Sequence, residues 1–249
     1  MDKALYIAMT GARASLQAQA TVSHNIANTD TPGFKEALAN TEAFPVKGPG
    51  FPSRVHALHI DAGFNGRVGA QNITGNALDV SLREGNWLAV QAADGSEGYT
   101  RGGALTLTPN GQLVTPGGHP VLDEGGNPIA LPPHQAVEIG NDGTISIIPQ
   151  GEGPQTMAMI GRLRVVEAED SQLQRGLDGL FRNTDTEQPF AQAQGASLQS
   201  GQLEGSNVNA AGALVQMIQL QRQYEMQVKV LKTGDEIARS SNTLLRLNG

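Results

Sequence analysis

The chain has 249 residues, 17 of them basic and 24 acidic, and a formal net charge of −7 at pH 7. This acidic balance argues against a nucleic-acid-binding domain, which needs basic side chains to contact phosphates. The absence of cysteine excludes disulfides, thiolate catalysis and cysteine metal sites. No apolar run reaches the ~18 residues that would predict a membrane-spanning helix.

Glycine and proline divide the chain into three regions. All 13 prolines lie between Pro32 and Pro189, and most of the 31 glycines lie between Gly33 and Gly205. Because both residues interrupt regular structure, their scarcity at the two ends predicts a long helix at each end and a broken middle. The expected fold class is α+β: two long terminal helices that pair as a coiled-coil-like unit, and an inserted all-β domain.

Residues 1–30 are expected to form the N-terminal helix. Its seam follows the 3-4 spacing of a heptad repeat through Leu5, Met9, Ala12, Leu16, Gln19, Ser23 and Ile26. Small residues such as Ala8 and Ala12 would allow close approach of another helix. The helix should end before Pro32, because proline lacks an amide proton and disfavours helical backbone at the residue before it.

The middle of the chain is expected to be β-structure. Turn signals rich in glycine recur over residues 81–185, at intervals close to the ~8–12 residues of a small sandwich or barrel. We therefore predict a β-rich outer domain of Greek-key or sandwich-like type, with a hairpin around residues 140–143. Residues 31–80 and 186–205 are expected to be irregular, extended segments that join this domain to the helices.

Residues 206–249 are expected to form the C-terminal helix, capped by Ser206, Asn207 or Asn209. Its seam contains Leu214, Met217, Tyr224, Val228 and Leu231, with polar interruptions at Gln221, Asp235 and Asn242. A helix over 209–245 would be roughly 55 Å long at ~1.5 Å per residue. A domain of about a hundred residues has a radius of gyration near 13 Å. We therefore expect the other helix, other subunits or both to cover the seam; an ordinary helix hairpin within one molecule is the alternative.

Motifs for catalysis or cofactor binding are missing from the sequence, including phosphate-binding loops and the zinc-protease and serine-hydrolase signatures. The carboxylate pairs Asp123/Glu124 and Glu167/Glu169 allow a β-rich cell-wall hydrolase as an alternative, because glycosidases use two carboxyls about 5–9.5 Å apart. We favour solvated turn residues, since aromatic platforms for a sugar are few. His56 and His59 are three residues apart, and we favour loop histidines over a metal site. The sequence thus predicts no enzyme, no cofactor and no metal; a ligand-binding β module with helical oligomerisation tails is a further alternative.

Motifs at both ends of the chain carry a resemblance to a known family. Residues 22–35, VSHNIANTDTPGFK, resemble the signature that ends the N-terminal helix in bacterial flagellar rod and hook proteins. Residues 203–209, LEGSNVN, resemble the motif that begins the C-terminal helix of that family. Residues 99–101 and 141–146 in the middle also match. The resemblance covers essentially the whole chain.

The resemblance implies an axial structural subunit of the flagellar basal body. Such a protein leaves the cell through the flagellar type III apparatus without a cleaved signal peptide, and polymerises helically in the periplasm. It forms a drive shaft that transmits motor torque and encloses the export channel. The implied partners are other copies, other proximal and distal rod proteins, and the MS ring or export-gate region. Length and the single β domain resemble proximal rod subunits most, with a distal rod subunit as the alternative.

Helix pattern and resemblance together predict where subunits meet. The seam residues of the two helices are expected to pack against one another within a subunit and between subunits, and the motif after the first helix is expected to set the turn into the outer domain. The predicted interface residues are Leu5, Met9, Leu16, Ile26, Asn28, Pro32, Gly33, Phe34, Asn207, Leu214, Met217, Tyr224, Val228 and Leu231.

Overall fold

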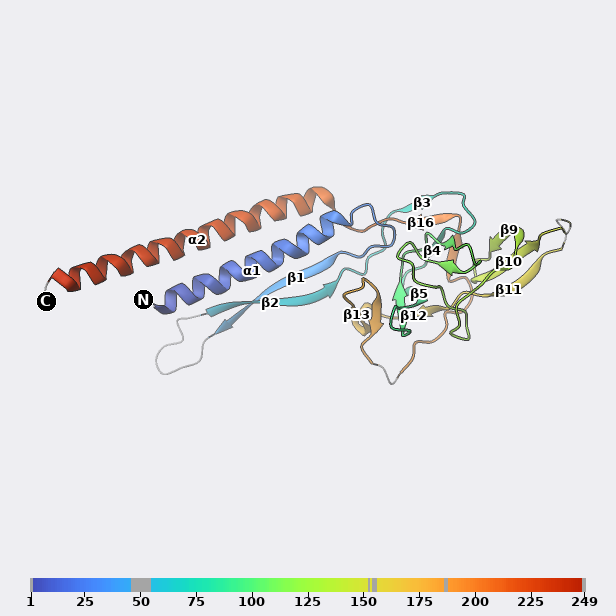
Figure 1. The fold of residues 1–249 in the computed structure, drawn as a ribbon, viewed down its shortest axis with the longest axis horizontal. Helices are drawn as coiled ribbons and strands as arrows, with labels where there is room; N and C mark the ends of the chain where they lie inside the picture. The colour runs from blue at the N-terminus through green and yellow to red at the C-terminus, as the bar shows by residue number, and fades with distance from the viewer. Residues whose placement is uncertain (1, 46–54, 152, 154–155, 186–187, 248–249) are drawn as a thin grey trace. The chain divides into compact units, whose positions relative to one another are not determined.

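The computed structural model describes residues 2–45, 55–151, 153, 156–185 and 188–247 (Figure 1). Helix α1 spans Asp2–Ala27 and helix α2 spans Ala210–Leu247. Strands and one 3-10 helix, η1 at Asp170–Gln172, form the described elements between them. The chain is therefore α+β, with a helix at each end of a mainly β middle, as the sequence predicts. Among the described residues, neither helix is long and apolar enough to cross a membrane.

The strands are short, as expected for a chain interrupted by so many glycines. Their bounds are β1 Ala37–Pro45, β2 Val55–Phe64, β3 Gln71–Ile73, β4 Val80–Leu82, β5 Asn86–Gln91, β6 Glu97–Thr100, β7 Thr106–Leu107, β8 Leu113–Val114, β9 His134–Ile139, β10 Thr144–Pro149, β11 Ala158–Arg162, β12 Val165–Glu167, β13 Leu173–Arg175, β14 Phe181–Asn183, β15 Leu198–Ser200 and β16 Gln202–Glu204.

Two compact units make up the chain. The helical unit contains residues 1–27, 37–63 and 209–249, and the β unit contains residues 28–36 and 64–208. Each unit is therefore assembled from segments that are far apart in the sequence, and each is described by itself below.

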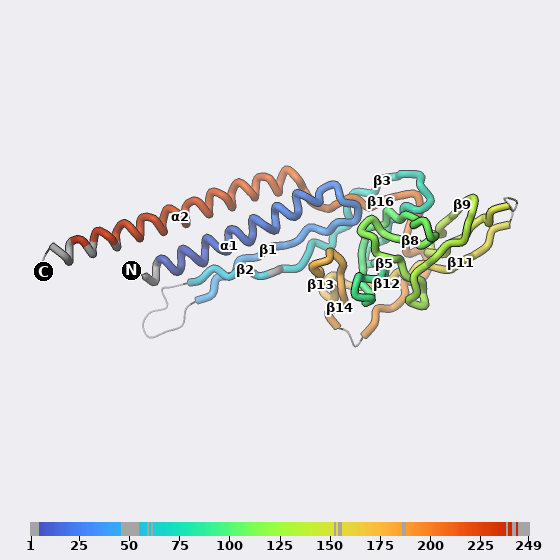
Figure 2. Tube along the Cα trace, in the orientation of Figure 1, coloured from blue at the N-terminus to red at the C-terminus, as the bar shows by residue number. Residues whose placement is uncertain are grey.

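In the helical unit, α1 packs against both α2 and β1, and β1 pairs with β2 in a two-stranded sheet (Figure 2). The Asn25 side chain joins α1 to this sheet: its Nδ2 donates to the Ala37 carbonyl and its Oδ1 accepts from the Ala37 amide, both at 2.9 Å. At the start of α2, the Asn209 Oδ1 accepts from the Gly212 amide at 3.2 Å, so Asn209 is the N-cap among the three predicted candidates.

Residues 31–80 are expected to be irregular and extended, but they contain the regular strands β1 and β2. The described side chains of β1 are half-buried or exposed, and most are exposed, so the sequence lacks the alternating apolar pattern by which a half-buried strand is recognised. Residues 186–205 likewise contain β15 and β16, which are only three residues each.

The β unit contains a five-stranded sheet in the order β12-β5-β6-β14-β13 and a three-stranded sheet in the order β11-β10-β9. The two-stranded sheets of this unit are β15-β4, β16-β3 and β7-β8. The predicted hairpin is confirmed: β9 and β10 are antiparallel with Ile139 opposite Ile145, and Gly143 in the turn has a φ of 90°. The Greek-key or sandwich arrangement stays a prediction.

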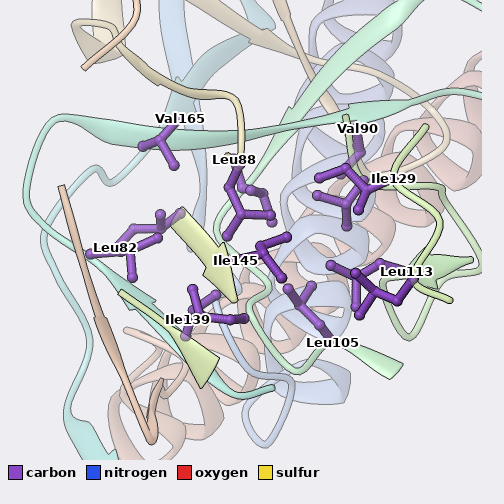
Figure 3. Close-up of a cluster of buried hydrophobic side chains, with 14 of the residues drawn as sticks. Leu82, Leu88, Val90, Leu105, Leu113, Ile129, Ile139, Ile145 and Val165 are labelled. Carbon is purple, nitrogen blue, oxygen red and sulfur yellow. The ribbon is translucent and has the colours of Figure 1, made fainter. Parts of the chain in front are cut away.

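Strand β5 lies between the two hydrophobic clusters of the β unit. Leu88 and Val90 belong to a large aliphatic cluster (Figure 3). Trp87 and Ala89 belong to a second cluster that is rich in aromatic side chains. Because successive side chains of a strand point to opposite faces, β5 supplies both clusters, and its four central residues are all buried.

Strands β15 and β16 bring the end of the β unit back to its beginning. β15 pairs with β4 and β16 pairs with β3, both antiparallel. These pairs place residues 198–204 beside residues 71–82, across more than a hundred residues of sequence. At the end of β16, Glu204 also bonds to Gly33 and Lys35, so the two family-like motifs of the chain meet there.

Candidate assembly site

Three charged side chains form a buried ion cluster in the β unit: Lys35, Arg101 and Glu204. Their side chains are 0%, 2% and 0% exposed. Lys35 Nζ donates to Glu204 Oε1 at 2.8 Å, and Arg101 Nε donates to Glu204 Oε2 at 2.7 Å. One carboxylate therefore pairs with two basic side chains from distant parts of the chain.

Arg101 is hydrogen-bonded on every side. Its Nη1 donates to the carbonyls of Arg83 at 3.0 Å and Asn86 at 2.7 Å, and its Nη2 donates to the Leu82 carbonyl at 2.8 Å and also contacts Glu204. Together with Nε, these contacts occupy the five N–H donors of a guanidinium. A lysine at this position would lack the planar fork that reaches the carboxylate and three carbonyls together.

Lys35 and Glu204 are equally well paired. Lys35 Nζ also donates to the carbonyls of Gly66 at 3.2 Å and Arg67 at 2.7 Å, and Glu204 Oε1 also accepts from the Gly69 amide at 2.9 Å. A buried charge is tolerated when it is paired and its remaining hydrogen-bonding capacity is filled. The cluster meets both conditions.

Burial and mutual charge shift the pKa of both titrating members of the cluster. Burial, followed by the positive charge of Arg101, lowers the pKa of Lys35 below its usual value. Burial alone would raise the pKa of Glu204, but the charge and hydrogen bonds of Arg101 and the hydrogen bond of Lys35 outweigh it, so the pKa of this carboxyl is lowered. The lowered pKa of Glu204 favours its ionised form beside the two basic side chains.

Gly33 makes the close turn beside this cluster. It has a φ of 71°, and a Cβ atom built on it would lie 2.3 Å from the Arg101 backbone. Its amide donates to the Glu204 carbonyl at 2.7 Å. Only glycine meets both the backbone conformation and the close approach.

Phe34, the residue before Lys35, is held by Arg175. The Arg175 guanidinium lies 4.4 Å from the centroid of the Phe34 ring, which is cation–π geometry. Arg175 Nη1 also donates to the Lys35 carbonyl at 3.2 Å. Phe34 itself is buried, so this contact fixes the motif against β13.

Asn207 joins the two motifs. Its Oδ1 accepts from the Glu36 amide at 2.7 Å, and its Nδ2 donates to the carbonyls of Asn65 at 2.7 Å and Arg67 at 2.9 Å. Further back, the Thr31 hydroxyl donates to Asn28 Oδ1 at 3.2 Å, which closes the turn that contains the half-buried Pro32. Of the predicted interface residues, the structure therefore gathers Asn28, Pro32, Gly33, Phe34 and Asn207 in the β unit.

The predicted residues of α1 divide between two degrees of burial. Leu5 and Ile26 are half-buried, whereas Met9 is 52% and Leu16 47% exposed. The buried stripe of α1 consists instead of small residues and one valine. The buried residues of α1 are Ala8, Ala12, Ala14, Ser15, Ala18, Val22 and the polar Asn25.

On α2, Met217, Tyr224, Val228 and Leu231 are half-buried, and Leu214 is 52% exposed. The half-buried stripe includes Leu220 and Gly234, each one residue before the polar interruption expected from the sequence. Glycine lies where the helices approach: a Cβ built on Gly11 would be 3.0 Å from Gln227 Nε2, and one on Gly234 would be 2.7 Å from Leu5 Cδ2.

Large apolar side chains remain on the outer faces of both helices, and we call them the outer stripes. The outer stripe of α1 is Tyr6, Met9 and Leu16; that of α2 is Leu214, Val215, Ile218, Met226, Val230 and Ile237. An apolar groove of about 600 Å³ lies beside Leu5 and is lined on α2 by residues that include Met226, Val230 and Ile237. Exposed apolar surface of this extent marks an interaction site.

Most of the candidates for chemistry make structural contacts among the described residues, and Glu167 and Glu169 line one cavity of the β unit. Glu124 accepts from Arg162 at 2.9 Å, and Asp123 Oδ1 accepts from the Asn127 amide in a turn. Glu169 caps η1, and Glu167 is exposed in β12. His56 Nδ1 lies 3.4 Å from the Thr10 hydroxyl, and the side chain of His59 lies outside the described residues. Among the described side chains, no group of three potential metal ligands is present.

Sequence reasoning omitted Lys35, Arg101 and Glu204 from the predicted site, although all three lie inside the matched motifs. The available signal is the residue type: a fixed charge within a motif of a chain in which only 16% of residues are charged. Such charges are rarely buried unless they are paired.

Comparison with known proteins places these motifs in one family. Three family models match: flagella basal body rod protein at residues 5–35, flagellar hook protein FlgE/F/G D1 domain at residues 84–147, and flagellar basal body rod FlgEFG protein C-terminal at residues 199–244. The chain is 44% identical to the flagellar basal-body rod protein FlgF of Escherichia coli (strain K12) and 42% identical to that of Salmonella typhimurium, over 100% of each chain. It is 31% identical to the rod protein FlgG of Buchnera aphidicola subsp. Schizaphis graminum, over 98% of this chain and 100% of that one.

Proposed function

The chain belongs to the flagellar basal-body rod protein family, and from this premise we propose how it builds the rod. It is a structural subunit of the flagellar basal body, and its 44% and 42% identity to two FlgF proteins over the full chain supports the proximal rod. A structural rather than a catalytic role is supported by the relatives, whose names describe rod proteins.

We propose that subunits assemble by covering one another's outer stripes. The observation that carries this proposal is the arrangement of α1, which buries small residues and exposes Met9 and Leu16. A helix that had evolved for a solitary hairpin would place its large apolar side chains inward. Burying one such side chain contributes about 1.5–3 kcal/mol, so several on each subunit favour a polymer.

The two helices would then act as a coiled-coil-like inner element, with Leu5, Ile26, Met217, Tyr224, Val228 and Leu231 in contacts within and between subunits. The partners would be other copies, other proximal and distal rod proteins, and the MS ring or export-gate region. We place the assembled rod in the periplasm, reached through the flagellar type III apparatus.

Torque transmission would depend on the β unit and on the turn that begins it. The ion cluster, Gly33 and Asn207 hold residues 33–36 and 204–207 together through charge-assisted and backbone hydrogen bonds. Charge-assisted bonds are about twice as strong as neutral ones, so these residues would resist twisting where the chain passes from helix to β unit.

Substitution of one outer-stripe residue tests the assembly proposal. Met226→Asp should abolish swimming and rod incorporation, because an aspartate cannot be covered by an apolar neighbour without a large desolvation cost. The control is Gln219→Asp at an exposed polar position of the same helix, which should swim normally. Unchanged Trp87 fluorescence would show that both variants keep the β unit folded. Normal swimming and incorporation of Met226→Asp would overturn the proposal.

A further inference from the structure

The ion cluster joins segments that are remote in sequence and leaves no member unpaired. Lys35 is separated from Glu204 by 169 positions, and Arg101 by 103. Contacts between such distant residues form only after loop-closure entropy has been overcome. Glu204 is the last of the three along the chain and the only anion among them.

Glu204 also makes the contacts that attach the returning strand. Its carbonyl accepts from the Gly33 amide, its Oε1 accepts from the Gly69 amide, and β16 pairs with β3. Asp170 is the other acidic group close enough to influence Lys35, but it is exposed. It therefore cannot replace Glu204 as the buried counter-charge.

Without Glu204, the positions of Lys35 and Arg101 would place two cations in one buried site with no anion between them. Burying uncompensated charge is strongly unfavourable. By contrast, the aliphatic cluster draws most of its members from residues 80–165 and contains none of the three charged residues. Most of this core can thus form from residues 80–165 while the ion cluster is still open, and Ala193 and Leu198 join it from the returning segment.

We propose that Glu204 closes the β unit as the last step of its folding. Until residue 204 arrives, residues 33–36 and 66–69 lack their contacts to β16, and the site that holds the two cations stays open to water. During synthesis the N-terminus appears first and residue 204 appears late. The β unit therefore stays open until nearly the whole unit has been synthesised. This closing step would operate whether or not the chain assembles into a rod.

Folding kinetics of the full-length protein test the order of events. The single tryptophan, Trp87, is buried in the core and reports folding by fluorescence. Glu204→Gln should speed unfolding about a hundredfold, because it leaves two buried cations unpaired. It should leave refolding within about twofold of the wild type, because a contact that forms after the transition state affects only the unfolding rate.

Three further variants keep this test specific. Glu124→Gln removes an exposed carboxylate that is also paired with an arginine, and should change neither rate appreciably. Lys35→Met leaves one cation with one anion and should speed unfolding less than Glu204→Gln. The double variant Lys35→Met/Glu204→Gln should unfold more slowly than Glu204→Gln, because one buried cation is fewer than two.

Hydrogen exchange of the wild-type protein decides the question even if Glu204→Gln does not fold. The Gly33 and Gly69 amides, both bonded to Glu204, should exchange at least about tenfold faster than the Ala89 and Val121 amides of the core. Equal exchange rates for all four amides, or a slowing of refolding by Glu204→Gln that matches its loss of stability, would overturn the proposal. An effect of Glu204→Gln no larger than that of Glu124→Gln would do so as well.

Discussion

At the scale of single residues, the β unit depends on a few positions that accept no substitute. Gly33 is required by its positive φ and by the Arg101 backbone, and Glu204 by its two cationic partners. Removing one partner of a buried ion pair costs about 3–5 kcal/mol, whereas an exposed pair contributes about 0–1 kcal/mol. Substituting the buried Glu204 should therefore destabilise the protein far more than substituting an exposed, paired glutamate such as Glu124.

Gly33→Ala tests the close approach, with Gly75→Ala as a matched control. Both glycines have a positive φ, 71° and 72°, but a Cβ on Gly75 meets nothing within 4 Å. Gly75→Ala should lose about 1–2 kcal/mol for the backbone conformation alone. Gly33→Ala should lose clearly more, measured by urea unfolding followed through Trp87 fluorescence. Equal losses would show that the Arg101 backbone moves away freely.

Acid unfolding tests the charge on Glu204. Its pKa is lowered in the folded state from an unfolded value of 4.5, so its stabilisation is present above pH 4.5 and is lost as the pH falls through the folded pKa. We expect the free energy of unfolding to decrease below about pH 4.5, and Glu204→Gln to flatten part of this decrease. An identical acid profile for the wild type and the variant would contradict the assignment.

At the scale of elements, the ends of both helices follow from the sequence, but their inward faces do so only in part. The scarcity of breakers predicts α1 and α2, and Pro32 and Asn209 explain where they end and begin. The seam predicts Ala12 and Leu16 on the same inward face, whereas the structure buries Ala12 and leaves Leu16 exposed, because periodicity identifies a stripe without showing what covers it. Likewise, no local pattern reveals that Lys35, Arg101 and Glu204 meet, since their pairing depends on the return of β16.

A pair of substitutions in α1 tests this arrangement. Ala12→Leu should destabilise the helical unit of the isolated subunit by about 1–3 kcal/mol, because extra methylene groups overfill a close contact. Leu16→Ala should leave the isolated subunit nearly unchanged, because Leu16 is 47% exposed. Thermal melting followed by circular dichroism measures both effects. Leu16→Ala should instead reduce incorporation of the subunit into the rod. If Leu16→Ala lowered the melting temperature of the isolated subunit more than Ala12→Leu does, the arrangement would be contradicted.

At the scale of the whole molecule, each unit is built from segments at both ends of the sequence. The β unit includes residues 28–36 and continues to Val208, so it extends beyond the predicted outer domain of residues 81–185. Its stability therefore depends on motifs that lie next to the helices in the sequence. In the sequence, each motif connects a terminal helix, which we propose to act in assembly, with the β unit. A substitution in a motif can therefore affect both assembly and folding.

Limited proteolysis of the isolated subunit should reveal this extent. The helices should be cut first, because their outer stripes lack partners in a single copy and isolated helices are marginal in water. The resistant material should retain residues 33–36 and 198–207, identified by mass spectrometry. A resistant fragment confined to residues 81–185 would mean that the motifs contribute little to the fold.

The most direct measurement is an electron cryomicroscopy map of the intact basal body in which this chain is traced. We predict that Met9, Leu16, Met226 and Val230 lie against side chains of neighbouring subunits, with little of their surface left open to solvent. Helices whose outer stripes faced water along the assembled rod, with neighbouring chains touching only the β units, would contradict the account.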